Sequence, residues 1–195
     1  MRLILVRHGR STWNAEGRLQ GVADPSLSPT GVEQARRLRV LVEALAPEEA
    51  VSSDLARARE TAQVLAGPGT ALDPRWREID IGAWTGRLIN DMSILELADL
   101  ERWRQGVTTP PGGETWEDAR TRILGAVRSL IDTGAGSALV VTHGAAIRAA
   151  CAALGDLDLA HLAGVPNASL SIIDTEPRPH LLAYGVAPGP AAVNS

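Results

Sequence analysis

Two short aliphatic runs, each ending in a histidine followed by glycine, constrain this chain more than any other feature. The first, residues 3–6, precedes Arg7-His8-Gly9, and the second, within residues 137–142, precedes His143-Gly144. Such short apolar runs are typical of strands that are buried on both faces of a parallel sheet. Because ligands bind outside the carboxyl ends of these strands, we expect both histidines to lie at one crevice.

The rest of the chain alternates helical and strand-like patterns, which is typical of an α/β fold. We expect helices over residues 32–45 with Thr30 as N-cap, 55–66 with Asp54 as N-cap, 115–131 and 145–154. Further strands are expected at residues 48–53, 70–73, 169–174 and 180–184, the last two as an antiparallel pair at the sheet edge. The predicted fold class is therefore a three-layer α/β/α sandwich with a mostly parallel central sheet.

One domain is expected over residues 1–195, because this length suffices for a single well-buried core and is short for two. Residues 87–114 are only weakly helical over 88–103 and end in a proline- and glycine-rich stretch. We interpret them as a small cap insertion over the sheet, of the kind that sets substrate choice. The tail, about 186–195, is rich in glycine, proline and alanine and is predicted to be mobile.

Composition argues against several functional classes. The net charge of -4 gives no overall attraction to nucleic acid or an anionic membrane, so neither is expected as a partner. All 19 basic residues are arginine, which removes Schiff-base and P-loop lysines. The single cysteine, Cys151, lies among alanines and cannot form an intramolecular disulfide. Neither a signal peptide nor a membrane span is expected, so we predict a cytoplasmic protein and leave a homodimer open.

The two strand-end histidines and their neighbouring arginine indicate chemistry on phosphorus. Either histidine alone would fit an ordinary loop residue, but the glycine after each one lets the backbone turn sharply and a ligand approach. Arginines hold a nearby histidine neutral by repulsion, and a neutral imidazole with a free ring nitrogen is a nucleophile. The same guanidinium groups match the geometry of phosphate. The four histidines show no metal-ligand spacing, so no metal is expected.

Four motifs, in order along the chain, resemble the histidine phosphatase superfamily, which includes the cofactor-dependent phosphoglycerate mutases. They are Arg7-His8-Gly9 with Ser11 and Asn14, Ser52-Ser53-Asp54-Leu55 with Arg57-Ala58 and Thr61-Ala62, Glu78 with Gly82 and Trp84, and Thr142-His143-Gly144. A fifth stretch, Pro111-Gly112-Gly113-Glu114-Thr115, is similar to a motif of the phosphatase branch.

The resemblance implies a role for each matched residue. His8 would accept the phosphoryl group as a phosphohistidine, while Arg7, Arg57 and His143 would bind the phosphate oxygens. Glu78 would protonate the leaving oxygen and then activate water. The resemblance further implies substrate contacts and no cofactor, with the contacts made by Asn14, Ser11, Gln20, Gly21 and Gly144.

Hydrolysis of a small phosphorylated metabolite is favoured over mutase activity, because the mutases use a longer, more basic insertion. A non-catalytic phospho-ligand-binding protein is the alternative from another class, although the retained catalytic residues count against it. A dinucleotide-binding module is disfavoured because no Gly-x-Gly-x-x-Gly follows a predicted strand.

The sequence departs from the family pattern at Arg10 and Thr85. We expect Arg10 to add positive charge at the pocket mouth and to favour more anionic substrates. Arg59, Asp80, His161 and His180 are interpreted as structural or surface residues.

Overall fold

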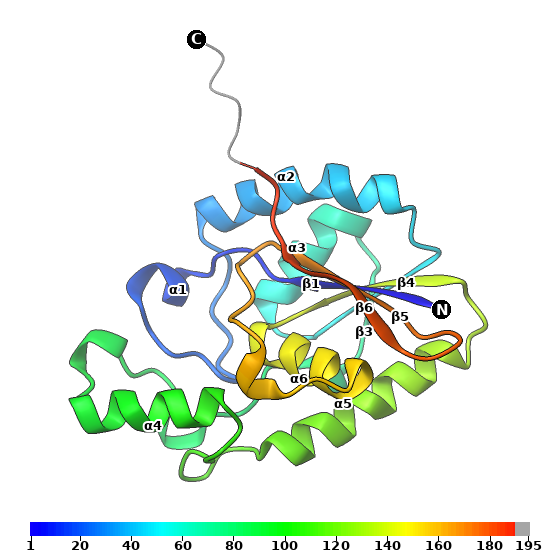
Figure 1. Ribbon diagram of the computed structural model, residues 1–195. Helices are drawn as coiled ribbons and strands as arrows, with labels where there is room; N and C mark the ends of the chain where they lie inside the picture. Colours follow the sequence, from blue (N-terminus) through cyan, green and yellow to red (C-terminus); the bar gives the residue numbers. More distant parts are fainter. Residues whose placement is uncertain (190–195) are drawn as a thin grey trace.

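A six-stranded sheet lies between two layers of helices in the computed structural model, which describes residues 1–189 (Figure 1). The strand order is β3-β2-β4-β1-β5-β6. The first four strands in this order run parallel, whereas β5 is antiparallel to β1 and β6 is antiparallel to β5. The strands are β1 (Arg2–Arg7), β2 (Glu49–Ser52), β3 (Ala71–Leu72), β4 (Ser137–Thr142), β5 (Leu170–Asp174) and β6 (His180–Val186).

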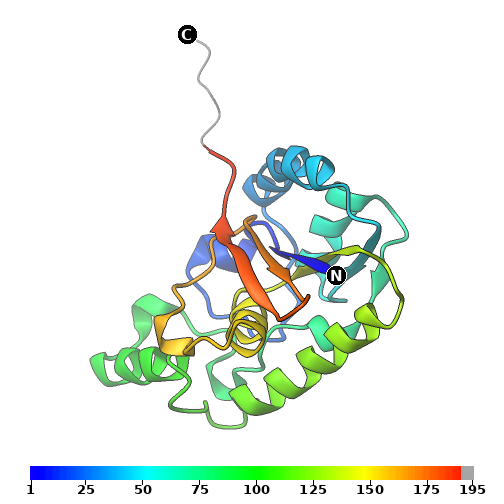
Figure 2. The ribbon, with the colours of Figure 1, turned by 45° about the vertical axis from the view of Figure 1, so that its right-hand side comes forward.

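Alternate side chains of β1 enter two separate cores. Leu3 and Leu5 pack against the helices of one face, and Ile4 and Val6 against those of the other. Successive strand residues point to opposite faces, so a strand covered by helices on both sides must be apolar throughout. Helices α2 (Pro29–Leu45) and α3 (Ala56–Ala66) cover one face, and α5 (Trp116–Ile131) and α6 (Gly144–Gly155) the other (Figures 1 and 2). The predicted three-layer, mostly parallel fold is confirmed.

A third core cluster lies beside the sheet and supports α4 (Ile94–Arg104). Leu100 and Trp103 of this helix pack there with Trp84, and Figure 1 shows α4 standing apart from the two helical layers. The helix is shorter than the 88–103 stretch expected, because Ser93 starts it with a capping box. Single turns of 3-10 helix complete the description: η1 (Pro74–Trp76), η2 (Gly82–Trp84), η3 (Ile89–Asp91) and η4 (Leu159–His161).

Two predicted helix caps are wrong. Ser28, not Thr30, caps α2, because Pro29 occupies the first helical position and the Ser28 hydroxyl accepts from Gly31 N. Asp54 does not cap α3 and instead pairs with Arg77 at 2.6 Å, while Oδ1 of Asp24 accepts from Ala56 N.

Helix α1 (Thr12–Glu16) was not predicted from the sequence, and strand β6 is longer than predicted. Helix α1 has only five residues and no buried ones, so it carries no hydrophobic period. Strand β6 extends to Val186, the first residue of the tail that we expected to be mobile. Residues 190–195 of that tail lie outside the described residues. Within residues 1–189, no helix has the length and apolar character needed to span a bilayer.

Candidate active site

The predicted crevice lies at the carboxyl ends of β1 and β4, which are adjacent parallel strands. The first long helix after β1, α2, covers one face of the sheet, and the helix after β4, α6, covers the other. Diverging connections of this kind open a crevice in which ligands bind. His8 follows β1 and His143 follows β4, and their ring centroids are 5.1 Å apart. The fold therefore brings the two histidines together.

A cavity of about 800 Å³ opens at this point. Among the residues predicted from the sequence, its lining includes Arg7, His8, Asn14, Gln20, Gly21, Arg57, Glu78 and Gly144. His143 and Ser11 are fully buried and do not belong to that lining. Ser11 contacts Asn14 and Gln20 of that lining, and its role as a substrate contact stays a prediction.

His8 is held as a neutral ring with one defined tautomer. Its Nδ1 lies 2.6 Å from the carbonyl oxygen of Gly9, so Nδ1 carries the hydrogen and donates it. Its Nε2 accepts from Nε of Arg57 at 3.3 Å. Burial, and then the charges of Arg57 and Arg7, hold the pKa of His8 well below its usual value of 6.5. The Nε2 lone pair is therefore available at neutral pH.

Arg57 and Arg7 place two cations at the inner end of the cavity. Arg57 is fully buried, and it donates to the carbonyl oxygens of Ala23 at 2.6 Å and Gly21 at 2.8 Å. Burial lowers its pKa to about 10, so the group stays charged at neutral pH. Among residues 1–189, no carboxylate lies within ion-pair distance of either arginine. Because buried charge needs compensation, the site is suited to an anion.

Unused hydrogen-bonding capacity also remains at the inner end of the cavity. Arg7 donates through Nη1 to the Val165 carbonyl oxygen, but its Nε is buried without a partner. His143 Nε2 lies 2.8 Å from the hydroxyl oxygen of Ser53, and its Nδ1 is also buried without a partner. Both atoms therefore keep hydrogen-bonding capacity for an anion beside these side chains, since buried polar groups are nearly always hydrogen-bonded. Burial, followed by the charge of Arg57, also lowers the pKa of His143.

The carboxylate of Glu78 lies at the first turn of α6. Its oxygens accept from the backbone amides of Ala145 at 3.2 Å and Ala146 at 3.1 Å. A third amide, that of Ile79, donates to Oε1 at 3.0 Å. A helix N-terminus favours a negative group, which explains why an isolated carboxylate is held beside the cavity.

A set of neutral side chains supports the site from behind. The Ser11 hydroxyl donates to Gln20 Oε1 at 2.7 Å and accepts from Asn14 N at 3.0 Å. Asn167 also belongs to this set, although it was not predicted from the sequence. Its amide nitrogen donates to the His8 carbonyl at 3.2 Å and to Asn14 Oδ1 at 3.3 Å. Its loop carries no periodic pattern, so no sequence signal could have placed it here.

The remaining lining of the cavity is rich in charged side chains, most of which were not predicted from the sequence to belong to a site. Its charged and titratable residues are Arg18, Glu101, Arg104, Arg148 and His161. His161 is an exposed residue, as expected, and it also lines the cavity. Arg10, by contrast, is exposed, lies outside the lining and reaches the Ala15 carbonyl at 3.4 Å. Arg10 therefore does not line the cavity itself, and its effect on the preference for anionic substrates stays a prediction. Within residues 1–189, no three His, Cys, Asp or Glu side chains gather as a metal-binding group.

Comparisons with known proteins agree with this geometry. A family model described as the histidine phosphatase superfamily (branch 1) matches residues 3–184. The chain is 36% identical over 157 residues to a probable phosphoglycerate mutase GpmB of Cronobacter sakazakii, covering 75% of this chain and 71% of that protein. Among solved structures, a mycobacterial glucosyl-3-phosphoglycerate phosphatase in complex with VO3 has a TM-score of 0.88 and 31% identity over 95% of this chain and 99% of that one. Bacillus stearothermophilus YhfR has a TM-score of 0.85 and 32% identity over 95% and 97%.

Proposed function

This chain belongs to the histidine phosphatase superfamily, and from that premise we propose that it hydrolyses a small phosphorylated metabolite through a phosphohistidine at His8. The observation that carries the proposal is the state of His8. Its Nδ1 donates a hydrogen bond to Gly9 O, and its unprotonated Nε2 faces the buried guanidinium of Arg57. A nucleophile is thereby placed beside the group that would neutralise its target.

In the first step, His8 Nε2 attacks phosphorus in line with the leaving oxygen. The N–P bond forms as the P–O bond breaks, and the protonated Glu78 carboxyl gives its hydrogen to the leaving alcohol. Arg7, Arg57 and Nδ1–H of His143 would hold the phosphoryl oxygens. Phosphoryl transfer needs mostly positioning and charge stabilisation of this kind. Arg7 Nε and His143 Nδ1, which have no partner among the described residues, fit that need.

In the second step, water attacks phosphorus and gives a proton to the Glu78 carboxylate. The N–P bond breaks, inorganic phosphate leaves, and His8 returns to its neutral form. Asn14, Gln20, Gly21 and Gly144 would contact the bound substrate, because they line the cavity around His8.

Hydrolysis and phosphoryl transfer to a second acceptor share the first step. Mutase activity is the runner-up, since a relative of this chain carries the name of a probable phosphoglycerate mutase. The name of the mycobacterial neighbour and the Pro111-Gly112-Gly113-Glu114-Thr115 stretch favour the phosphatase.

A panel of phosphomonoesters, assayed with and without 2,3-bisphosphoglycerate, tests this proposal. We expect release of inorganic phosphate without isomerisation of phosphoglycerate. Isomerisation that depends on the bisphosphate would instead establish a mutase.

The intermediate is tested by rapid quenching. Phosphohistidine formed on the wild-type chain is expected to survive a base quench and to be lost in acid. His8→Ala is expected to abolish both the labelled intermediate and turnover. Near-full turnover by His8→Ala would contradict the mechanism.

A further inference from the structure

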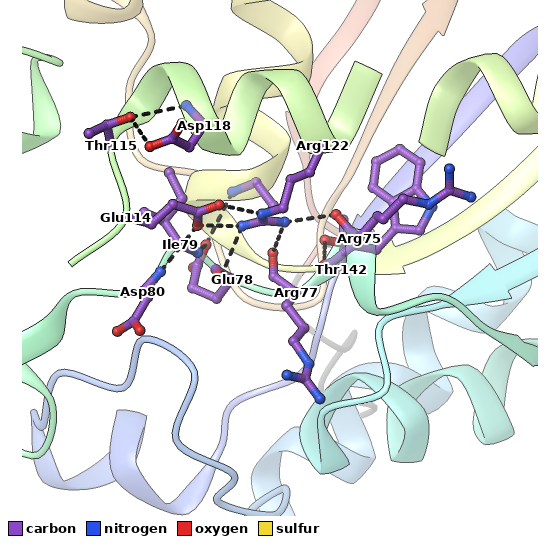
Figure 3. Close-up of polar contacts among 12 residues, drawn as sticks. Arg75, Arg77, Glu78, Ile79, Asp80, Glu114, Thr115, Asp118, Arg122 and Thr142 are labelled. Atoms are coloured by element: carbon purple, nitrogen blue, oxygen red, sulfur yellow. Dashed lines mark hydrogen bonds and ion pairs between the residues drawn. The ribbon is translucent and has the colours of Figure 1, made fainter. Parts of the chain in front are cut away.

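Arg122 of α5 uses all of its hydrogen-bond donors on a single short segment and one carboxylate (Figure 3). Its Nε and Nη2 bind both oxygens of Glu114, at 2.6 and 2.8 Å. Its Nη1 donates to the carbonyls of Arg75 at 2.7 Å and Arg77 at 2.8 Å, and its Nη2 donates to the carbonyl of Glu78 at 3.1 Å. A guanidinium has five N–H groups in a rigid fork, so none remains for a ligand.

The segment held in this way has little regular structure of its own. Residues 77–81 lie between η1 and η2 and belong to no strand, so their carbonyls lack ladder partners. Glu114 adds a second connection, because its backbone N donates to Asp80 O at 2.8 Å. Glu78 is consequently fixed at two points, with its backbone carbonyl on Arg122 and its carboxylate on the first turn of α6.

This arrangement separates Arg122 and Glu114 from the phosphate end of the site. Neither side chain lines the cavity, and their mutual ion pair is largely shielded, with 21% and 17% of the side chains exposed. The charge of Arg122 contributes, after burial and nearer groups, to the lowered pKa of His143. Apart from that electrostatic effect, which Arg122→Lys preserves, the pair acts on catalysis through the segment that carries Glu78.

We propose that Arg122 and Glu114 form a positioning pair that sets the location of the Glu78 carboxyl for proton transfer to the leaving oxygen. The inference rests on the proposed function, in which Glu78 is the general acid. Arg122 fixes the main chain of this segment from α5, and Glu114 fixes the guanidinium so that it points at those carbonyls. A displacement of about 1 Å at such a position costs on the order of a hundredfold in rate.

Dependence on the leaving group distinguishes this role from a merely structural one. p-Nitrophenol leaves without protonation, whereas the alcohol of glycerol phosphate needs a proton from the acid. The comparison uses kcat/KM, which reports the first step alone, because the second step needs Glu78 for every substrate. For Arg122→Met we expect kcat/KM for glycerol phosphate to fall about a hundredfold, and kcat/KM for p-nitrophenyl phosphate to fall less than about fivefold. Inhibition by inorganic phosphate is expected to stay unchanged, because the anion site is intact.

The matched control is Arg75→Met. Arg75 also joins this segment to α5, donating to Gly125 O at 3.1 Å and Ser129 Oγ at 3.0 Å, and it is paired with Asp73. Its side chain does not contact Glu78, so both substrates should be turned over at wild-type rates. Glu114→Gln and Arg122→Lys provide variants with smaller structural changes, and both should show the leaving-group dependence of Arg122→Met.

The outcomes separate this inference from the proposed function. Equal losses of kcat/KM for both substrates, or weaker inhibition by phosphate, in Arg122→Lys and Glu114→Gln would overturn the positioning role. In a Glu78→Gln background, Arg122→Met should cause no further loss with glycerol phosphate, and an additive loss would also overturn the role. A wild-type chain that hydrolyses neither these two substrates nor any other phosphomonoester of the panel would instead refute the proposed function itself.

Discussion

At the scale of single residues, the site is defined by cations and neutral imidazoles that are buried together. Arg57 is fully buried, and its donors go to two carbonyls and to His8 Nε2. The energetic cost of burying such a charge is recovered when an anion enters. Burial, and then the same charge, keep the pKa of each histidine low, which favours the neutral rings that nucleophilic attack and directed hydrogen bonding require.

Ser53 is expected to fix the tautomer of His143. Its hydroxyl oxygen accepts from Leu55 N at 3.3 Å and lies 2.8 Å from His143 Nε2. We expect the hydroxyl hydrogen to be donated to Nε2, which places the ring hydrogen on Nδ1. Ser53→Ala should lower kcat/KM about tenfold, the value of one hydrogen bond to the transition state. Steady-state kinetics and phosphate inhibition measure this effect.

Ser52→Ala is the control for Ser53→Ala. The neighbouring Ser52 hydroxyl is also buried, but it donates to the Ser53 carbonyl at 2.8 Å and not to a histidine. Its variant should retain wild-type activity, and equal losses in the two variants would contradict the tautomer argument.

At the scale of elements, the turn after β1 packs directly on the start of α2. A Cβ added to Gly9 would lie 2.3 Å from Gly31 O, and one added to Gly31 would lie 2.1 Å from Arg10 O. No side chain fits between the two backbones, so the glycines allow α2 to approach the turn that carries His8. The same turn is tied to α3, because Gly9 N donates to Thr61 Oγ1 at 3.1 Å.

The same substitution in two helices is predicted to have opposite effects on stability. Gly31→Ala should lower the free energy of unfolding by about 2 kcal/mol or more, because α2 must move away from the turn. Gly125→Ala in α5 should raise it by about 0.5–1 kcal/mol, since the nearest atom to the new Cβ is 4.0 Å away and alanine favours helix. Urea denaturation of both variants measures these changes, and a stabilised Gly31→Ala would refute the close-packing argument.

At the scale of the whole molecule, the two buried histidines should make folding sensitive to acid. Unfolding exposes them and restores a pKa near 6.5, whereas burial and Arg57 hold their native pKa well below that value. As pH falls below 6.5, the unfolded chain binds protons that the native chain does not. The free energy of unfolding therefore decreases as pH falls from 6.5 towards the native pKa values of the two histidines. Above pH 6.5 it does not depend on these two groups.

Each histidine is expected to contribute a slope of about 1.4 kcal/mol per pH unit in this window. Urea titrations at a series of pH values from 7.5 to about 5 measure the combined slope. His8→Asn and His143→Asn should each make the dependence shallower by about one histidine's share. A dependence that neither variant changes would show that other groups control acid sensitivity.

Local sequence patterns determined much of the architecture and the identity of the candidate site. The aliphatic runs of β1 and β4 are buried on both faces, so they read as central strands without tertiary information. The histidine, arginine and glutamate positions followed from short motifs, and the structure groups His8, Arg7, Arg57 and Glu78 around one cavity beside the buried His143. The caps were mispredicted because several residues nearby could satisfy the same backbone groups. Helix α1 was not predicted because its five residues carry no hydrophobic period.

Only the tertiary structure decided which distant groups support this site. Arg122 reads as an ordinary polar residue of α5, Asn167 lies in an irregular loop, and Arg148 lies in an alanine-rich helix. Arg122 donates to the carbonyl of Glu78 and Asn167 to that of His8, both distant in sequence. Arg148 donates to the carbonyls of Arg104, Leu159 and Leu162. Backbone carbonyls are identical at every position of a chain. Sequence specifies the chemistry of a side chain, but the partner that a guanidinium meets is set by packing across the whole fold.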